Sequence, residues 1–379
     1  MKARALGFVS LLLLLLMLMV AAGFAQGLSG AAAGGPASRT ENVVVIVTDG
    51  LRWQEVFGGA EAVLISSKPG GVEDEAATKR AFWRETAEAR REALLPFLWT
   101  VVAKQGVLWG NRMAGSSAQV ANGYRFSYPG YNEILTGAPD PRIDSNEFGP
   151  NPNVSVFEWM NGQAGFEGRV GVVAGWTAFD RIFNHPRSHL DMRIGWETPE
   201  PGATAPRAQL LNTMYATITR EFSDMPWDAL LQQTLLEYVR SKKPRLLFVG
   251  FGETDEWAHN GRYDLVLASA HAVDGFIREL WDTMQAMPEY RGKTTFLITT
   301  DHGRGSGEEN WKHHDWNVAG AEDMWIAALG PDTPALGARE NVPRVTQSQI
   351  AATAAALLGK DWTAANSKAA PPLPDVLRR

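Results

Sequence analysis

The chain has 379 residues, no cysteine and a formal net charge of -6 at pH 7. The lack of cysteine excludes a disulfide framework and a lipoprotein attachment site, and a chain of this length buries a large core without such cross-links. The small net charge gives no electrostatic reason to expect binding to a nucleic-acid polymer or to an anionic membrane surface.

The first residues have the pattern of a secretory signal peptide. Positive charge at Lys2 and Arg4 precedes an apolar run from Leu6 to about Ala22, and small residues suited to cleavage follow. The run approaches the length that spans a bilayer, so an uncleaved membrane anchor is the alternative. We predict a signal peptide over 1–25 and export to the periplasm or the medium, with no other membrane contact.

The rest of the chain predicts one domain. Residues 26–40 are rich in glycine, alanine and serine, which is typical of a flexible linker. An α/β domain is expected over 41–365, and a tail over 366–379.

Three short apolar runs, at 41–48, 245–251 and 294–300, are typical of strands buried on both faces of a sheet. Residues 170–174 and 324–329 supply two further strands. Apolar residues at three- and four-residue spacing predict helices over 93–105, 227–240 and 264–287, and 347–358 is an alanine-rich helix.

Strands of this type that alternate with helices predict a central, mostly parallel sheet sandwiched by helices. Residues 182–208 contain proline and glycine and have weak periodicity. We interpret them as a small insertion that caps the site.

Each of the three apolar runs is followed by an acid: Asp49, Asp255 and Asp301. Ligands of open α/β sheets bind at the carboxyl ends of the strands. A single acid there is also a common helix N-cap or turn residue. Three such acids with histidines beside them instead predict a metal site.

The histidines follow the acids at informative spacing. His259 is four residues after Asp255, which places both side chains on one face of a helical turn. His302 is adjacent to Asp301, so both serve one site only if the chain bends, as Gly303 permits. His313 and His314 follow nearby, and this mixture of oxygen and nitrogen donors suits zinc or manganese. The remaining histidines, His185, His189 and His271, lack acidic neighbours and are interpreted as structural or surface residues.

Ser127 is the candidate nucleophile. Pro129 favours a first helical turn, so Ser127 would lie at a helix N-terminus, where backbone N–H groups attract an anion. An ordinary N-cap serine fits the same residues equally well. Spacing alone leaves both interpretations open.

In this order the motifs resemble the alkaline phosphatase superfamily, from Val43 to about Leu358. The family pattern has an aspartate after the first strand, a Ser or Thr before an Ile-Leu-Thr-Gly-like end, Asp-x-x-x-His, Asp-His-Gly and a late histidine. The resemblance implies that two divalent ions, zinc or manganese, are held by two ligand sets. The first set is Asp49, Asp301 and His302, and the second is Asp255, His259 and His314. The first ion would also contact the Ser127 oxygen. The register from Trp311 favours His314 over His313, which stays the alternative.

The resemblance further implies an enzyme that hydrolyses small phosphoesters through a covalent phosphoseryl intermediate on Ser127. Sulfatases of this fold have Cys/Ser-x-Pro-x-Arg, and Tyr131 stands here in place of that arginine. Monoester and diester substrates both remain open. Arg52, Tyr131 and Trp257 are the candidate substrate-binding residues.

Three alternatives remain from the sequence. An arylsulfatase-like enzyme conflicts with the missing arginine, and a phosphomutase-like enzyme conflicts with export, since those members are cytosolic. A non-catalytic exported metal-binding protein would not need Ser127 beside a complete ligand set.

Overall fold

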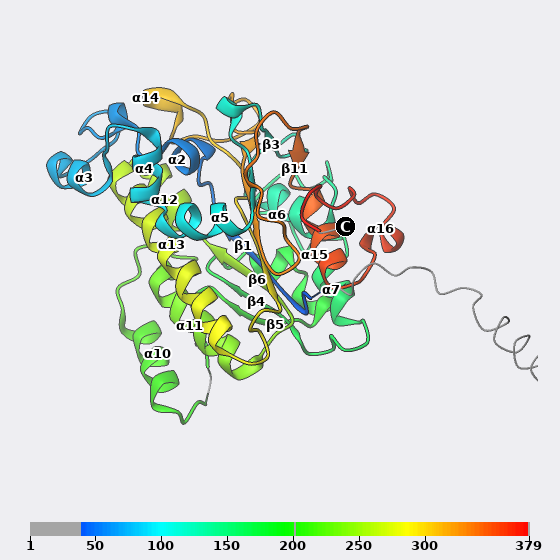
Figure 1. The fold of residues 1–379 in the computed structure, drawn as a ribbon. Coiled ribbons are helices and arrows are strands. Elements are labelled where there is room, and N and C mark those ends of the chain that lie inside the picture. The colour runs from blue at the N-terminus through cyan, green and yellow to red at the C-terminus, as the bar shows by residue number, and fades with distance from the viewer. Residues whose placement is uncertain (1–38, 201, 378–379) are drawn as a thin grey trace, which may run out of the picture. The chain divides into compact units, whose positions relative to one another are not determined.

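The computed structural model describes residues 39–377 except residue 201, so the predicted signal peptide and nearly all of the predicted linker lie outside the described residues. The main sheet has eight strands in the order β10-β2-β9-β7-β1-β6-β4-β5. Helices lie on both sides of it (Figure 1). The predicted α/β class is therefore confirmed.

The centre of this sheet is the strand β1 (Asn42–Thr48), which is buried along its whole length. It pairs in parallel with β6 (Leu246–Phe251) on one side and with β7 (Thr294–Thr299) on the other. These three strands are the apolar runs expected from the sequence, and their β-branched and aromatic residues fill both faces of the sheet. Their carboxyl ends therefore meet at one edge.

The outer strands are shorter. β4 (Val170–Ala174) and β5 (Asp191–Ile194) continue the parallel order beyond β6. On the other side, β9 (Ile326–Leu329) is antiparallel to β7 and to β2 (Val107–Trp109), and β10 (Gly337–Ala338) is parallel to β2. A separate sheet contains β3 (Ala118–Gln119), β8 (Asp323–Met324) and β11 (Val345–Thr346).

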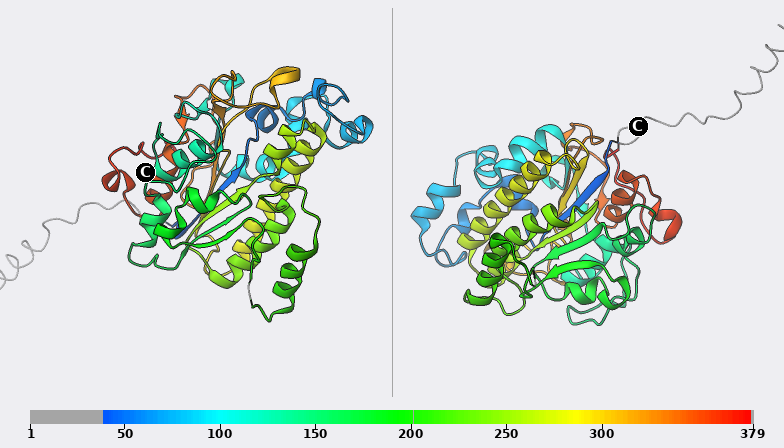
Figure 2. Two further views of the ribbon diagram at one scale, coloured as in Figure 1. Left: turned by 180° about the vertical axis from the view of Figure 1, so that it is seen from behind. Right: turned by 90° about the horizontal axis from the view of Figure 1, so that it is seen from below.

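Two apolar clusters cover the faces of the sheet (Figures 1 and 2). One face packs against α6 (Ser127–Thr136), α7 (Val156–Asn161), α8 (Phe179–Ile182) and α15 (Gln349–Leu357). The other packs against α2 (Trp53–Gly58), α4 (Ala87–Leu94), α11 (Asp228–Lys242) and α13 (Tyr263–Ala286). The remaining α-helices are α3 (Glu75–Phe82), α5 (Ala103–Gln105), α9 (His185–Ser188), α10 (Pro206–Thr217), α12 (Glu253–His259), α14 (Gly307–Asn310) and α16 (Trp362–Ala365). Within the described range, no helix has the length and apolar character needed to cross a membrane.

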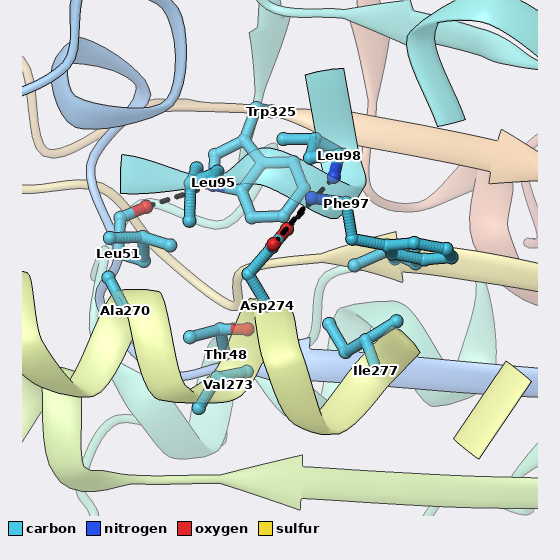
Figure 3. A pocket seen from close by; sticks show the side chains of 11 residues that line it. Thr48, Leu51, Leu95, Phe97, Leu98, Ala270, Val273, Asp274, Ile277 and Trp325 are labelled. Carbon is cyan, nitrogen blue, oxygen red and sulfur yellow. Dashed lines mark hydrogen bonds between the residues drawn. The ribbon is translucent and has the colours of Figure 1, made fainter. Parts of the chain in front are cut away.

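The helix predicted over 93–105 is broken in the structure. The helix α4 ends at Leu94, and a π-helical turn at Leu98–Val102 leads into α5. Pro96 explains the break, since it has no N–H to donate and disfavours helical geometry in the residue before it. Figure 3 shows Asp274 of α13 reaching across a small apolar cavity to accept hydrogen bonds from the backbone nitrogens of Phe97 and Leu98.

Two other segments differ from the expectation. The segment 182–208 contains β5, an edge strand of the main sheet that the sequence analysis did not predict. Its burial pattern is mostly intermediate, so it lacks the apolar alternation by which strands are recognised. The strand expected over 324–329 is divided at Trp325 between β8 and β9, which belong to different sheets.

The buried carboxyl of Asp274 makes the stability of the fold depend on pH. Burial raises the pKa of Asp274 from 3.8 to about 6, although the two backbone N–H groups oppose this. A carboxyl whose folded pKa is raised contributes stability at low pH and loses it as the pH rises through the folded pKa. Relative to Asp274→Asn, the wild-type free energy of unfolding should therefore fall by about 2 kcal/mol between pH 4.5 and 7.5.

Urea unfolding of both proteins across this pH range measures the difference. Asp282→Asn is the control, since Asp282 is an exposed acid on the same helix. A difference between wild type and Asp274→Asn that does not change with pH would contradict the prediction.

Candidate metal centre

The three predicted acids converge at one edge of the sheet. Asp49 directly follows β1, Asp255 lies in α12 just after β6, and Asp301 lies two residues beyond β7. Because β6 and β7 flank β1, the ends of these strands bring the three carboxylates together. The hydroxyl of Thr254 donates to the carbonyl of Asp49 at 2.5 Å and ties α12 to the end of β1.

A first group of donor atoms surrounds the buried ring of His302. Its Nε2 atom lies 3.4 Å from Asp49 Oδ1, 3.5 Å from Asp301 Oδ2 and 3.4 Å from Ser127 Oγ. Ligands about 2.0–2.1 Å from one tetrahedral zinc ion lie about 3.3 Å from one another. Asp49 Oδ1 and Asp301 Oδ2 are buried and have no hydrogen-bond partner among the described residues. The group fits a single divalent cation.

The orientation of His302 also suits a ligand. Its Nδ1 lies 2.9 Å from the carbonyl of Gly303, which accepts a hydrogen bond from this nitrogen. With the proton on Nδ1, the Nε2 atom carries a lone pair that can bind a metal ion, as in other metal-binding histidines.

A second group lies beside the first. Asp255 Oδ2 is 3.0 Å from His259 Nε2, which is 3.0 Å from His314 Nε2. The rings of His314 and His302 stack with their centroids 4.1 Å apart, so the two groups of donor atoms are directly adjacent. His313 is exposed, and His314 is the one of the two histidines that the structure brings to the site.

The electrostatics of the site call for cations. Burial, together with the neighbouring carboxylates, raises the pKa of Asp49 and that of Asp301 well above 3.8. Burial and the nearby His302 lower the pKa of His314 to about 2, so this imidazole is neutral at ordinary pH and available as a ligand. Bound divalent ions would remove the repulsion between the carboxylates.

Ser127 is the first residue of α6, as expected from Pro129, and only 6% of its surface is exposed. The first turn of α6 lies directly on the backbone of Asp301, where a Cβ on Gly130 would come within 2.4 Å of the Asp301 carbonyl oxygen. Glycine at this position therefore lets the helix, and with it the serine hydroxyl, approach the donor atoms.

The three candidate substrate-binding residues make contacts that do not fit substrate binding. Arg52 is 3% exposed and its guanidinium is paired with Glu55 and Glu61. Tyr131 is buried and donates from its hydroxyl to Asp49 Oδ2 at 2.8 Å, so it orients a ligand. These contacts leave Arg52 and Tyr131 no surface for a substrate.

Trp257 is half-buried and packs against Phe222 and Trp227, and its Nε1 lies 3.4 Å from Glu253 Oε2. Its indole belongs to an aromatic cluster rather than to the two donor groups.

Sequence reasoning missed two residues at the site. Arg304 directly follows the Asp-His-Gly motif and its guanidinium contacts Asp255. Asn146 accepts a hydrogen bond from Tyr128 N at 2.9 Å, which places its side chain at the first turn of α6, next to Ser127. The position after Asp-His-Gly could have drawn attention to Arg304, whereas the loop around Asn146 carries no motif.

Removal of the Tyr131 hydroxyl should weaken zinc binding. Partners that orient a metal ligand typically change metal affinity by about 10–100-fold when they are lost. We expect Tyr131→Phe to bind zinc at least about tenfold more weakly in competition with a chelator. Tyr128→Phe is the matched control, since this buried tyrosine of the same helix bonds to carbonyls away from the donor groups. Equal affinity in Tyr131→Phe and wild type would contradict the assigned role.

Asp301→Asn should stabilise the protein when no ion is bound. A carboxyl with a raised folded pKa loses its stability contribution as the pH rises, so at pH 8 the tendency of Asp301 to ionise opposes folding. Asparagine keeps an oxygen that can accept from Gly50 N, as Asp301 Oδ1 does at 3.1 Å. In chelator at pH 8, the variant should melt roughly 2 °C or more above wild type.

Added zinc should reverse this order, because only the wild type keeps the full ligand set. Asp264→Asn is the control, for which the melting temperature should change in the opposite direction. Burial raises the pKa of Asp264, but hydrogen bonds from the Arg262 side chain and the Glu73 backbone nitrogen lower it below 3.8 overall. That variant should melt lower than wild type. A lower melting temperature for Asp301→Asn in chelator would contradict the electrostatic interpretation.

Comparisons with known proteins agree with this architecture. The model of the type I phosphodiesterase / nucleotide pyrophosphatase family matches residues 69–360, which include Ser127, Asp255 and Asp301. No curated protein matches the chain.

Several solved structures share the fold. The wild-type alkaline phosphatase PafA has 10% identity and a TM-score of 0.54, over 91% of this chain and 100% of that chain. The phosphonate monoester hydrolase SpPMH from Silicibacter pomeroyi has 13% identity and a TM-score of 0.54, over 88% and 76%. The lipoteichoic acid synthase LtaP from Listeria monocytogenes has 9% identity and a TM-score of 0.53, over 86% and 73%. The chain is a hydrolase of the alkaline phosphatase superfamily and belongs to the type I phosphodiesterase / nucleotide pyrophosphatase family.

Proposed function

We propose that the protein is an exported phosphodiester hydrolase with two divalent ions, zinc or manganese, and Ser127 as its nucleophile. The observation that carries the proposal is the position of Ser127 Oγ, 3.4 Å from His302 Nε2 and on the rim of the first donor group. A hydroxyl at that place is poised for activation by a bound cation. Export rests on the signal-like pattern of residues 1–25.

The reaction would take place in two displacements. Divalent ions, when bound, lower the pKa of the Ser127 hydroxyl and neutralise charge on the phosphate oxygens. Ser127 would lose its proton to solvent and Oγ would attack phosphorus. The bond to the leaving oxygen would break on the side of His259 and His314, and that oxygen would take up a proton from solvent to leave as an alcohol. Water then attacks the phosphoseryl group, its proton returns to Oγ, and the phosphate monoester is released.

The basic side chains near the motifs are already paired with acids, which favours diester over monoester substrates. A monoester presents three unesterified oxygens and usually requires a free arginine or lysine. Arg52 is buried against Glu55, Arg125 lies 3.1 Å from Glu322, and Lys312 lies 3.6 Å from Glu309. The family match to phosphodiesterases supports the same choice.

Neutral and apolar groups are instead available to a second ester group. The amide nitrogen of Asn146, at the first turn of α6, is suited to donate to a phosphate oxygen. A hollow of about 610 Å³ lies along the loop that leads into Ser127 and is lined in part by Tyr124, Pro141 and Trp316. Trp316 is 66% exposed and offers the hollow an apolar wall.

The proposal predicts a substrate order and its dependence on Ser127. With zinc or manganese, the purified protein should hydrolyse bis-para-nitrophenyl phosphate faster than para-nitrophenyl phosphate, and both faster than the sulfate ester. Ser127→Ala should lose at least about a thousandfold in kcat/KM, because the substitution removes the hydroxyl that attacks phosphorus in the proposed first step.

Ser188→Ala is the matched control, since Ser188 is equally buried at 6% exposure but lies in α9. It should keep wild-type activity. Undiminished activity in Ser127→Ala, or activity on the sulfate ester alone, would remove the serine phosphodiesterase from consideration.

A further inference from the structure

The two donor groups differ in charge. The first contains two carboxylates, those of Asp49 and Asp301, and the ring of His302. The second contains a single carboxylate, that of Asp255, together with the imidazoles of His259 and His314. A divalent cation is therefore attracted more strongly to the first group than to the second.

Arg304 increases this difference. Its side chain is 1% exposed, and its guanidinium is paired with Asp255 Oδ1. The same guanidinium donates to the carbonyl of Asp255 at 3.1 Å and to the carbonyl of Lys312. Asp255 Oδ1 is thus occupied by a fixed cation, and Oδ2, 3.0 Å from His259 Nε2, is the oxygen that remains for an ion.

The surrounding backbone is shaped to hold this pair. A Cβ on Gly50 would come within 2.3 Å of Asp255 Oδ1 and 2.9 Å of Arg304 Nε, so glycine leaves the space that the ion pair fills. The residues on either side of Arg304 are also fixed: Gly303 N donates to Ala321 O at 2.9 Å, and Gly305 N donates to His313 O at 3.0 Å. The backbone on either side of Arg304 is therefore held in place.

We propose that Arg304 is a built-in cation of the second donor group, which makes a divalent ion bind there more weakly than at the first group. The inference rests on the two-ion site of the proposed function. It adds that the protein retains one ion firmly and acquires the second only as the free metal concentration rises. The positive charge of Arg304 and its hold on Asp255 Oδ1 both act in this direction.

Replacement of Arg304 by an uncharged residue of similar length tests the inference. Calorimetric titration of the chelator-treated protein with zinc chloride should resolve a tight and a weaker site in the wild type. In Arg304→Met the weaker site should bind at least about tenfold more tightly, with the tight site unchanged. After dialysis against metal-free buffer, wild type should retain about one zinc per chain and Arg304→Met about two.

Arg304→Lys separates charge from packing. It keeps the positive charge and should retain the weak second site, as in wild type. If Arg304 merely oriented Asp255 as a ligand, Arg304→Met would instead weaken the second site by about 10–100-fold. Weaker or unchanged binding in Arg304→Met overturns the inference.

The wild-type titration alone also tests it, should Arg304→Met fail to fold. Two zinc ions bound with equal affinity would overturn the role of Arg304 and leave the proposed function intact. A chain that never binds a second ion, even in millimolar zinc, would overturn the two-ion proposal itself. Both results are read from metal binding and do not depend on turnover of a substrate.

Discussion

The repulsion among three buried carboxylates is the constraint on which the rest of this structure depends. Asp49, Asp255 and Asp301 are each less than a tenth exposed and lie at adjacent strand ends. Arg304 supplies a counter-charge that pairs directly with Asp255 and acts on Asp49 only as a minor influence. For Asp49 and Asp301 the ionised form remains unfavourable, as the raised pKa of each shows. Cations that bind between them would stabilise the ionised carboxylates, and the relief of their repulsion would strengthen cation binding.

The scaffold holds this arrangement by close backbone approach. β1 lies between β6 and β7, so the central strand ends where two acids from its neighbours face it. Gly130 lets the first turn of α6 rest on Asp301, and Gly50 makes room for Asp255 and Arg304. Tyr131 then fixes the second oxygen of Asp49 from within the same helix that carries Ser127. The proposed nucleophile and a candidate metal ligand are therefore positioned by one helix.

Local pattern explains what the sequence could predict. The runs that became β1, β6 and β7 are apolar throughout because both faces of each strand are buried, and the acids after them follow from the topology. Pro96 could have signalled the break in the helix, which was predicted as continuous over 93–105. Contacts distant along the chain have no such local signal: Asp274 caps a turn 176 residues away, and the burial of Arg52 depends on its pairing with two acids. The same limit hid Asn146, whose position is defined by a hydrogen bond to Tyr128.

The difference in burial between the two donor groups gives the proposed reaction a direction. His302 and Asp301 are fully buried beneath α6, where Ser127 would form and lose its bond to phosphorus. The second group opens outward, since the side chain of His259 is 44% exposed. A leaving alcohol that departs past His259 therefore meets solvent at once. Arg52, Arg125 and Lys312 are each paired with an acid, so in the proposed reaction a phosphomonoester product would have only the bound ions to offset its additional charge, which would favour its release.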